Sequence, residues 1–341
     1  MKKFILKTVL FVLPFLSIHV FYLMTAENHV LKDLNRIGKL NISYDYFSKY
    51  PESKLDTIYF EYFANNTNNK YTVLNIGDSF SRQEMKGTSG YVNFLAKQHT
   101  LLNMPFSNPF ERIEELLNNN ILDTINVDYV ILQSVHRNIL NKLNSVKEKS
   151  IKSKHQLREY DVHIRQKFLN EFSSVNEKSV LFSRHNLYYI LNALLKKDIR
   201  EKVIISKTKE NLFSYEENKL VFYADDIKGL EEKNNIAQIK KANEKLNILS
   251  EKLKNIGIKL IVIIPPDKYD FYYDDLIKPL NKKLIFYDVL DSLKKDYIYF
   301  NPKKVLRKNK DFKKDLYFFD DTHWSPIASK IIAQKINEFI K

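Results

Sequence analysis

The fold class follows from one stretch of the sequence, Val73-Leu74-Asn75-Ile76-Gly77-Asp78-Ser79-Phe80. Its apolar, β-branched first half is typical of a buried strand, and Gly77 stops that strand. In open α/β sheets, ligands bind at the carboxyl ends of the strands, which is where this stretch places Ser79. The stretch therefore predicts an α/β protein with a functional site beside Ser79.

The segments around this stretch alternate between strand and helix patterns. Strands are predicted at residues 71–76, 101–104, 127–132, 203–206 and 258–264, with 284–287 as a candidate last strand. Helices are predicted at residues 91–98, 109–118, 236–256 and 326–340. Helices that connect successive strands imply a parallel sheet that is covered on both faces.

The composition excludes several kinds of chemistry. The chain has 341 residues, no cysteine and a formal net charge of +14. The lack of cysteine excludes disulfides, thiolate catalysis and cysteine-based zinc sites. The lysines are spread along the chain without interleaved aromatic residues, so the positive charge does not indicate nucleic-acid binding. Because no pair of histidines has the spacing of a metal site, no metal and no cofactor are predicted.

The N-terminus has the pattern of a membrane-directed segment. Two lysines at positions 2 and 3 precede an apolar run over residues 4–24, which is long enough to cross a bilayer as a helix. The positive flank predicts that the rest of the chain lies outside the cytoplasm. We therefore predict a single-pass N-terminal anchor at residues 1–26 in the cell membrane, with a cleaved signal peptide as the alternative.

The remaining chain divides into two parts. Residues 27–70 are polar and predict a lead-in or stalk. Residues 71–341 predict the main domain, with a polar, helical insertion at about 141–200. No internal repeat divides this domain further.

A serine nucleophile needs a base, and the sequence offers one near its C-terminus. The hydroxyl of Ser79 is a weak nucleophile until a histidine, oriented by a carboxylate, removes its proton. In the segment Asp320-Asp321-Thr322-His323-Trp324, one loop can hold both the carboxylate and the imidazole. Ser79, Asp321 and His323 are therefore the predicted catalytic triad. The alternative is that Ser79 and Asp321 only cap helices and that His323 is a loop residue.

These residues carry a resemblance to a known family. Gly77-Asp78-Ser79-Phe80 resembles the first block of SGNH (GDSL-type) hydrolases, and Asp321-Thr322-His323-Trp324 resembles their last block. The Thr-His-Trp form is similar to the alginate O-acetyltransferase-like branch, whose members modify exported polysaccharides. The segments 129–137 and 263–269 also resemble that branch, the second by its Pro-Asp-Lys-Tyr ending. The resemblance runs from about residue 71 to the C-terminus and implies a three-layer α/β/α, flavodoxin-like SGNH fold with a mainly parallel sheet.

Two features depart from the family's pattern. In the alginate-type enzymes the Asp-x-His block precedes the serine block, whereas here Ser79 comes first. The Gly and Asn blocks that supply oxyanion donors are also not evident, although losing one donor can cost about 10²–10³ in rate. The residues predicted to donate to the oxyanion or to bind substrate are Gln133, Ser134, Arg137, Lys268, Tyr269 and Trp324.

The resemblance implies a function. It predicts extracytoplasmic transfer of an acyl group, such as acetyl, to a cell-envelope or secreted polysaccharide. In that family an integral membrane acyltransferase typically delivers the acetyl group, so such a partner is expected beside the polysaccharide acceptor. Two alternatives remain open: a carbohydrate esterase (deacetylase) of the same fold, and a non-catalytic glycan-binding or assembly protein of an envelope export complex.

Overall fold

The computed structural model describes residues 1–25, 33–38, 58–59, 70–81, 90–123, 125–146, 202–215, 218–310 and 314–340. Most of the predicted lead-in and of the predicted insertion at 141–200 lies outside the described residues. The first residues of that insertion belong to helix α6 (His136–Ser145).

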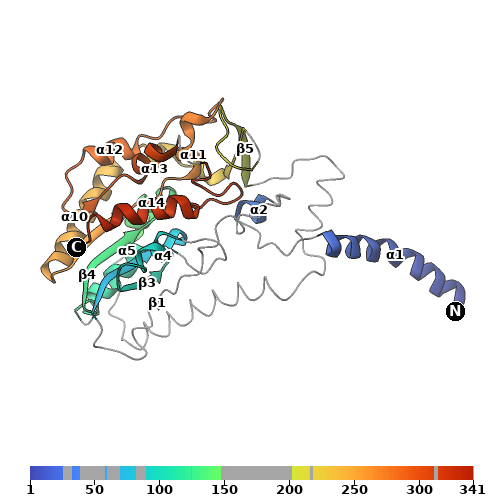
Figure 1. Cartoon of the computed structure of the whole chain (residues 1–341), viewed down its shortest axis with the longest axis horizontal. Coiled ribbons are helices and arrows are strands. Elements are labelled where there is room, and N and C mark those ends of the chain that lie inside the picture. The colour runs from blue at the N-terminus through green and yellow to red at the C-terminus, as the bar shows by residue number, and fades with distance from the viewer. Residues whose placement is uncertain are drawn as a thin grey trace.

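A parallel sheet forms the centre of the described structure (Figure 1). Within the described residues it has six strands in the order β1-β3-β2-β4-β7-β8, and every neighbouring pair is parallel. The strands are β1 (Ile58–Tyr59), β2 (Tyr71–Gly77), β3 (Leu101–Pro105), β4 (Val127–Gln133), β7 (Lys259–Ile263) and β8 (Ile298–Tyr299). The predicted α/β class and parallel sheet are confirmed.

The order of the strands reverses at one place in the sheet. If the short edge strand β1 is set aside, the order reads 2-1-3-4-5, which is the flavodoxin-like order. In such sheets the order reverses between the first and third strands, and ligands bind at their carboxyl ends. Here those strands are β2 and β4, which are paired at Gly77 and Gln133. Ser79 follows β2 directly, so it lies at this switch point.

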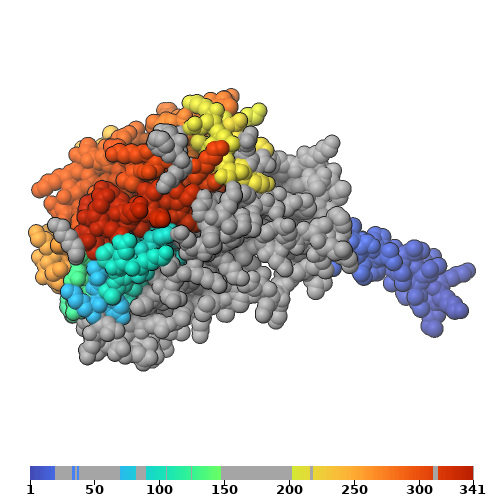
Figure 2. Space-filling view, viewed as in Figure 1, coloured from blue at the N-terminus to red at the C-terminus, as the bar shows by residue number. Residues whose placement is uncertain are grey.

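Two hydrophobic clusters hold helices on the two faces of the sheet, as expected for strands whose side chains alternate between the faces. On one face, strand residues such as Val73 and Ile131 pack with α4 (Tyr91–Leu95), α13 (Pro302–Lys310) and α14 (Pro326–Asn337). On the other, strand residues such as Leu74 and Leu132 pack with α6 and with α5 (Pro109–Asn118), α10 (Ile236–Asn255) and α12 (Phe286–Ser292). Helix α4 contacts α14, and Figure 2 shows the teal segment around α4 beside the red C-terminal part of the chain. The predicted three layers are therefore present.

Local sequence explains where two long helices begin and end. In α14, the hydroxyl of Ser325 accepts a hydrogen bond from the Ile327 amide, and Pro326 occupies the first turn. In α10, the side chain of Asn235 accepts from the Gln238 amide. Gly257 follows α10 with a φ of +81°, a conformation that favours glycine.

The candidate strand at 284–287 was wrong. Residues from Phe286 onward form α12, and the last strand of the sheet is β8. Phe286, Tyr287 and Leu290 are buried, which is helical spacing, and a stretch of four residues was too short to show it. The strand predicted at 203–206 is present as β5 (Val203–Lys207), but it pairs antiparallel with β6 (Lys219–Tyr223) in a separate two-stranded sheet.

Helix α1 (Lys2–Thr25) covers the predicted N-terminal anchor. Large apolar side chains on its described part are exposed, including those of Phe4, Leu10 and Phe11. Among the residues that the structure describes, no helix combines the length and the apolar character needed to cross a membrane.

Candidate active site

Ser79 lies in a tight turn that requires a residue without a side chain at position 77. Strand β2 ends at Gly77, and Ser79 begins the short 3-10 helix η2 (Ser79–Ser81). A Cβ atom on residue 77 would lie 1.9 Å from Ser81 Oγ and 2.6 Å from Gln133 Oε1. The glycine of the Gly-Asp-Ser motif therefore lets the turn fold back against β4.

Replacing Gly77 with alanine is expected to lower the free energy of unfolding by about 1–3 kcal/mol, because the added methyl overpacks a buried turn. Urea denaturation of the variant and the native chain measures this loss. The double variant Gly77→Ala/Ser81→Gly should lose less free energy of unfolding than the sum of the losses in the two single variants. The reason is that Ser81→Gly removes Ser81 Oγ, the atom closest to the added methyl. Additive losses would contradict the close approach.

The carboxylate of Asp78 organises this turn. It accepts hydrogen bonds from the amide of Val135 (2.8 Å), from Gln133 Nε2 (2.7 Å) and from Lys142 Nζ (2.8 Å). Burial alone would raise the pKa of Asp78, but the Lys142 ammonium and the hydrogen bonds lower it below its ordinary value. A permanently ionised Asp78 thus ties the turn after β2 to the start of α6.

A buried network of neutral side chains lies beneath the turn. Ser81 Oγ donates to Gln133 Oε1 at 2.8 Å and lies 3.0 Å from the hydroxyl of Tyr91. Tyr91 donates in turn to Asn75 Oδ1, and Asn103 Nδ2 donates to the carbonyl of Ser81. Because these groups are fully buried and hydrogen-bonded to one another, they hold the turn in one conformation.

Asp321 and His323 come together in the loop before α14. His323 Nδ1 lies 2.5 Å from Asp321 Oδ1, and the His323 amide donates to the same oxygen at 2.9 Å. The loop is closed by an antiparallel bridge between Tyr317 and Trp324. Burial would lower the pKa of His323, but the Asp321 carboxylate raises it above its ordinary value. The pair has the arrangement in which a carboxylate orients a histidine through Nδ1.

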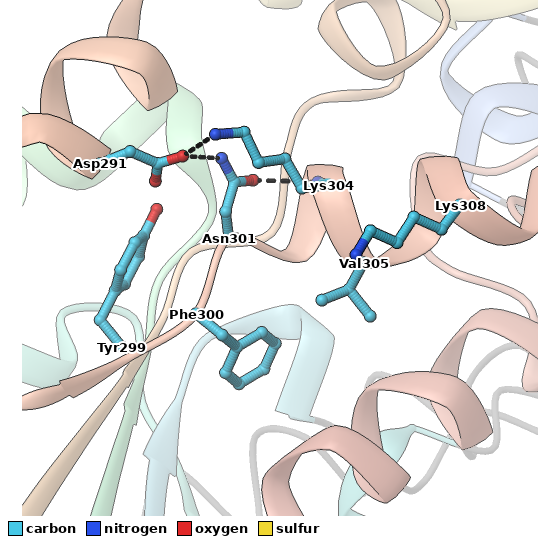
Figure 3. Close-up of a pocket in the computed structure, with 7 residues that line it drawn as sticks. All are labelled: Asp291, Tyr299, Phe300, Asn301, Lys304, Val305 and Lys308. Atoms are coloured by element: carbon cyan, nitrogen blue, oxygen red, sulfur yellow. Dashed lines mark hydrogen bonds and ion pairs between the residues drawn. The ribbon is translucent and has the colours of Figure 1, made fainter.

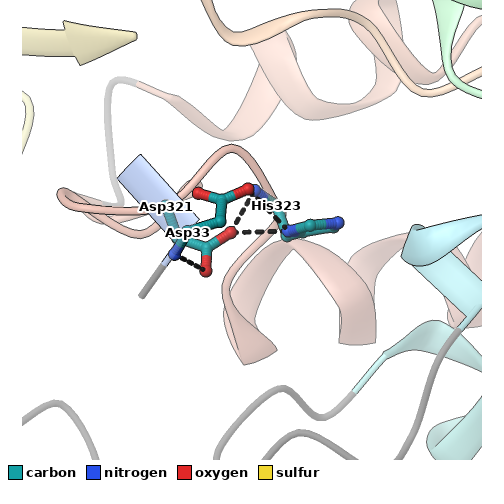
Figure 4. Close-up of side chains that lie close together, drawn as sticks. All are labelled: Asp33, Asp321 and His323. Carbon is teal, nitrogen blue, oxygen red and sulfur yellow. Dashed lines mark hydrogen bonds and ion pairs between the residues drawn. The ribbon is translucent and has the colours of Figure 1, made fainter. Parts of the chain in front are cut away.

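The imidazole of His323 packs against the turn that carries Ser79. Phe80, the residue after Ser79, packs its ring on the imidazole with 4.7 Å between ring centroids, and it meets Trp324 edge-on at 5.1 Å. The imidazole extends away from the carboxylates, with Nε2 at its far end (Figure 4). Within the described residues Nε2 has no hydrogen-bond partner, Ser79 included. Nε2 is therefore a buried nitrogen that no described side chain engages.

A second carboxylate, from Asp33, joins this pair (Figure 4). Asp33 begins helix α2 (Asp33–Gly38) and lies within the predicted lead-in. Its Oδ2 is 3.6 Å from His323 Nδ1, and its amide donates to Asp321 Oδ2 at 3.2 Å. The sequence analysis missed Asp33, because no motif or hydrophobic pattern surrounds it.

The three side chains do not call for a metal. Ligand atoms of Asp33, Asp321 and His323 lie within 4.8 Å of one another. However, His323 Nδ1 is already hydrogen-bonded to Asp321, and that nitrogen would have to give up this bond to coordinate an ion. A proton shared within the Asp–His pair accounts for the geometry, and we assign no metal to it.

Two of the predicted oxyanion donors, Gln133 and Ser134, lie at the end of β4 beside the turn, and they differ in their hydrogen bonds. Gln133 is fully buried, and its amide group is committed to Asp78 and Ser81. Ser134 is also buried, but its hydroxyl has no hydrogen-bond partner among the described residues. Of these two side chains, Ser134 is the one with a free donor at the switch point.

Arg137 lies at a pocket next to the site. Its guanidinium donates to Asp226 (2.8 Å) and Asp267 (3.1 Å) and stacks 5.6 Å from the ring of Tyr223. Burial and the charge of Asp226 raise the pKa of Asp267 to about 8, while the Arg137 guanidinium acts in the opposite direction. The pocket has a volume of about 440 Å³ and is lined by residues of α6 and of the segment 223–233. Arg137 is thus paired, yet it borders a space that a ligand can enter.

Lys268, Tyr269 and Trp324 are buried and contact the interior of the protein. The ammonium of Lys268 donates to the carbonyls of Phe318 (2.7 Å), Phe319 (2.7 Å) and Asp321 (3.2 Å). The Tyr269 hydroxyl accepts from two amides of the segment 280–281. The structure therefore does not place these three side chains on a surface where a glycan can bind, and Lys268 instead holds the loop of Asp321.

A further pocket, of about 380 Å³, lies at β8 and α13 and contains none of the predicted site residues (Figure 3). Asp291 anchors it, with its Oδ2 2.9 Å from Asn301 Nδ2 and 2.6 Å from Lys304 Nζ. Because Asp291 Oδ2 is bound by the pocket's own Asn301 and Lys304, we assign no function to this pocket.

Comparison with known proteins agrees with the motifs at the site. The family model for the SGNH hydrolase-like domain of acetyltransferase AlgX matches residues 220–341. This range includes the segments 265–269 and 321–324, whereas Ser79 lies outside it. No match to the chain was found among curated proteins or among solved structures. Residues 220–341 therefore match the SGNH hydrolase-like domain of AlgX acetyltransferases, which is the branch that the sequence motifs resemble.

Proposed function

We propose that the protein is a serine O-acetyltransferase of the SGNH type that transfers acetyl groups to hydroxyls of a cell-envelope or secreted polysaccharide. The observation that carries the proposal is the Asp321–His323 pair at the switch point of a flavodoxin-like sheet. Its imidazole packs on Phe80, the residue after Ser79, and Nε2 has no hydrogen-bond partner among the described residues. The match of residues 220–341 to an acetyltransferase domain favours acyl transfer over other serine chemistry.

The proposed reaction has two halves. His323 Nε2 takes the proton of Ser79 Oγ, and Oγ attacks the carbonyl carbon of the acetyl donor. The leaving group departs with that proton, which leaves an acetyl ester on Ser79. A sugar hydroxyl then gives its proton to His323 and attacks this ester, so that the acetylated sugar and free Ser79 are formed. Asp321 keeps the imidazole proton on Nδ1 and stabilises the imidazolium, and the Ser134 hydroxyl is a candidate donor to the oxyanion.

The proposal places this chemistry outside the cytoplasm. Lys2 and Lys3 precede the exposed apolar side chains of α1, which is the charge pattern of an exported or membrane-anchored chain. An acetyl donor must reach that compartment, and an integral membrane acyltransferase is the partner that we expect to supply it. The polysaccharide is the acceptor.

The proposal is tested by trapping the acyl-enzyme. The full-length chain is mixed with p-nitrophenyl acetate, quenched in acid and digested, and the peptide that contains Ser79 is examined by mass spectrometry. We expect an acetyl group on Ser79 in the native chain and only background acetylation in His323→Ala, because the base is needed to activate the serine. Because lysines also react with this ester, acetylation is scored only on the peptide that contains Ser79. His99→Ala, whose imidazole lies outside the site, serves as the matched control for removing a histidine.

Addition of acceptors separates the possible outcomes. Faster nitrophenol release and an acetylated product on adding a polysaccharide fragment would establish transfer. Release that is unaffected by acceptors would indicate an esterase. A native chain in which Ser79 carries no acetyl group, with background release in every variant, would overturn the proposal in favour of a non-catalytic glycan-binding protein.

A further inference from the structure

The contacts of Asp33 differ from those of an ordinary helix cap. Asp33 is the first residue of α2, where a capping carboxylate would accept hydrogen bonds from amides of its own helix. Instead, its Oδ1 accepts from the amide of Thr322 at 2.8 Å, and its Oδ2 accepts from the Thr322 hydroxyl. Both oxygens are therefore bound to the residue that lies between Asp321 and His323.

The backbone of α2 also holds the loop. The amide of Asp33 donates to Asp321 Oδ2. The other oxygen of the Asp321 carboxylate, Oδ1, is hydrogen-bonded to His323 Nδ1. The amide of Leu34 donates to the carbonyl of Asp320 at 3.1 Å. Two consecutive residues of α2 thus bind three consecutive residues of the loop, 320–322.

Helix α2 is itself fixed in the hydrophobic core. Leu34 is fully buried in the cluster that contains Phe80 and Trp324, and Ile37 packs against that cluster. The helix also contacts β5 and β6. Although α2 is short, it therefore has an anchored position from which Asp33 can restrain the loop.

We propose that Asp33 is a positioning residue of the acyl-transfer site, which the N-terminal lead-in supplies to hold Asp321 and His323 in register for Ser79. This inference rests on the proposed function. Asp33 acts through Thr322 and Asp321. Burial and the Asp321 carboxylate raise the pKa of Asp33 to about 6, so near neutral pH its negative charge lies beside the imidazole. The lead-in is then part of the catalytic machinery as well as a connection to the N-terminal helix.

The charge of Asp33 provides a signature that a merely structural role would lack. Burial lowers the pKa of His323, Asp321 and Asp33 raise it, and Arg137 lowers it. Removing the charge of Asp33 should therefore lower the pKa of His323. Because the base must be neutral, activity rises as the pH increases through this pKa, and the acid limb of the pH–rate profile should move to lower pH in Asp33→Asn.

The experiment compares the full-length native chain with Asp33→Asn and with Asp128→Asn, a matched loss of one carboxylate that is 45% exposed and pairs with Lys70. For Asp33→Asn we expect kcat for acetyl ester cleavage to fall roughly 10- to 100-fold, because small displacements of a catalytic group are costly. We also expect the acid limb to shift downward, with both properties unchanged in Asp128→Asn. Thr322→Val, which removes only the hydroxyl donor, should lose less activity and keep the native acid limb.

A second readout keeps the test independent of turnover. The pKa of His323 is measured by NMR titration in the native chain and in Asp33→Asn, with the resonance assigned through His323→Ala. A lower pKa in Asp33→Asn supports the proposal, and an unchanged pKa together with native kcat overturns it. If the native chain and Ser79→Ala cleave esters equally, the proposed function fails, while the NMR titration still decides whether Asp33 acts on His323.

Discussion

Replacing Ser79 with alanine is expected to reduce kcat for cleavage of an acetyl ester by about 10⁴-fold or more, and His323→Ala should have a loss of similar size. The serine supplies the attacking oxygen, and the histidine removes its proton, so neither can act without the other. The free Nε2 of His323 and the contact of Phe80 with the imidazole place both groups at one edge of the sheet.

The double variant Ser79→Ala/His323→Ala gives the sharper result. Because the two residues act as one unit, the double variant should be no slower than the slower single variant, and the losses should not multiply. The controls are Ser250→Ala on α10, where the native hydroxyl donates to the carbonyl of Asp296, and His99→Ala, where the native imidazole binds Asn337. Both should keep native kcat. A Ser79→Ala chain that retains kcat within about tenfold of the native value would identify another nucleophile.

Replacing Lys268 with methionine is expected to lower the free energy of unfolding by about 3–5 kcal/mol, because three buried hydrogen bonds from a charged donor are lost and each such bond contributes about 1.5–3 kcal/mol before the cost of burying the charge is deducted. The ammonium is fully buried and donates to three carbonyls at the base of the loop that carries Asp321, so the variant removes this donor from all three. Its position 5.1 Å from the ring centre of Phe213 adds a cation–π contact that methionine cannot replace. Activity should fall with stability, since one of the three carbonyls that accept from Lys268 belongs to Asp321.

Urea denaturation followed by tryptophan fluorescence measures this effect, because the single tryptophan, Trp324, lies in the same loop. Lys283→Met is the matched control. Its ammonium pairs with Asp274 at the surface, where both side chains are nearly half exposed, so the expected loss is below about 1 kcal/mol. Equal denaturation midpoints for Lys268→Met and the native chain would mean that the buried ammonium does not hold the loop.

Local sequence patterns predicted most of the sheet and its helices. Strands β2, β4 and β7 and helices α5, α10 and α14 lie where their hydrophobic periods and terminal residues indicated. Those signals are local, because a period of two or of 3.6 residues is set within one element. The order of the strands in the sheet, by contrast, depends on pairing between distant segments, and here the flavodoxin-like order came only from a resemblance.

Local sequence patterns could not predict the roles of several site residues. Gln133 and Lys268 stand where the sequence predicted contacts with the oxyanion or substrate, but the structure commits both to buried hydrogen bonds. A polar residue at the end of a strand is equally compatible with a ligand and with a buried partner. Only the positions of those partners distinguish the two cases.

The sequence by itself determined the parallel α/β class and the close pairing of Asp321 with His323, since two residues in one short loop need no other part of the chain to meet. The tertiary structure decided which groups surround that pair. Asp33 reaches Thr322 across 289 positions in the chain, a contact that no local pattern encodes. Such contacts arise because α2 and the loop that carries Asp321 and His323 belong to one hydrophobic cluster. Burial of that cluster brings their polar groups within hydrogen-bonding distance.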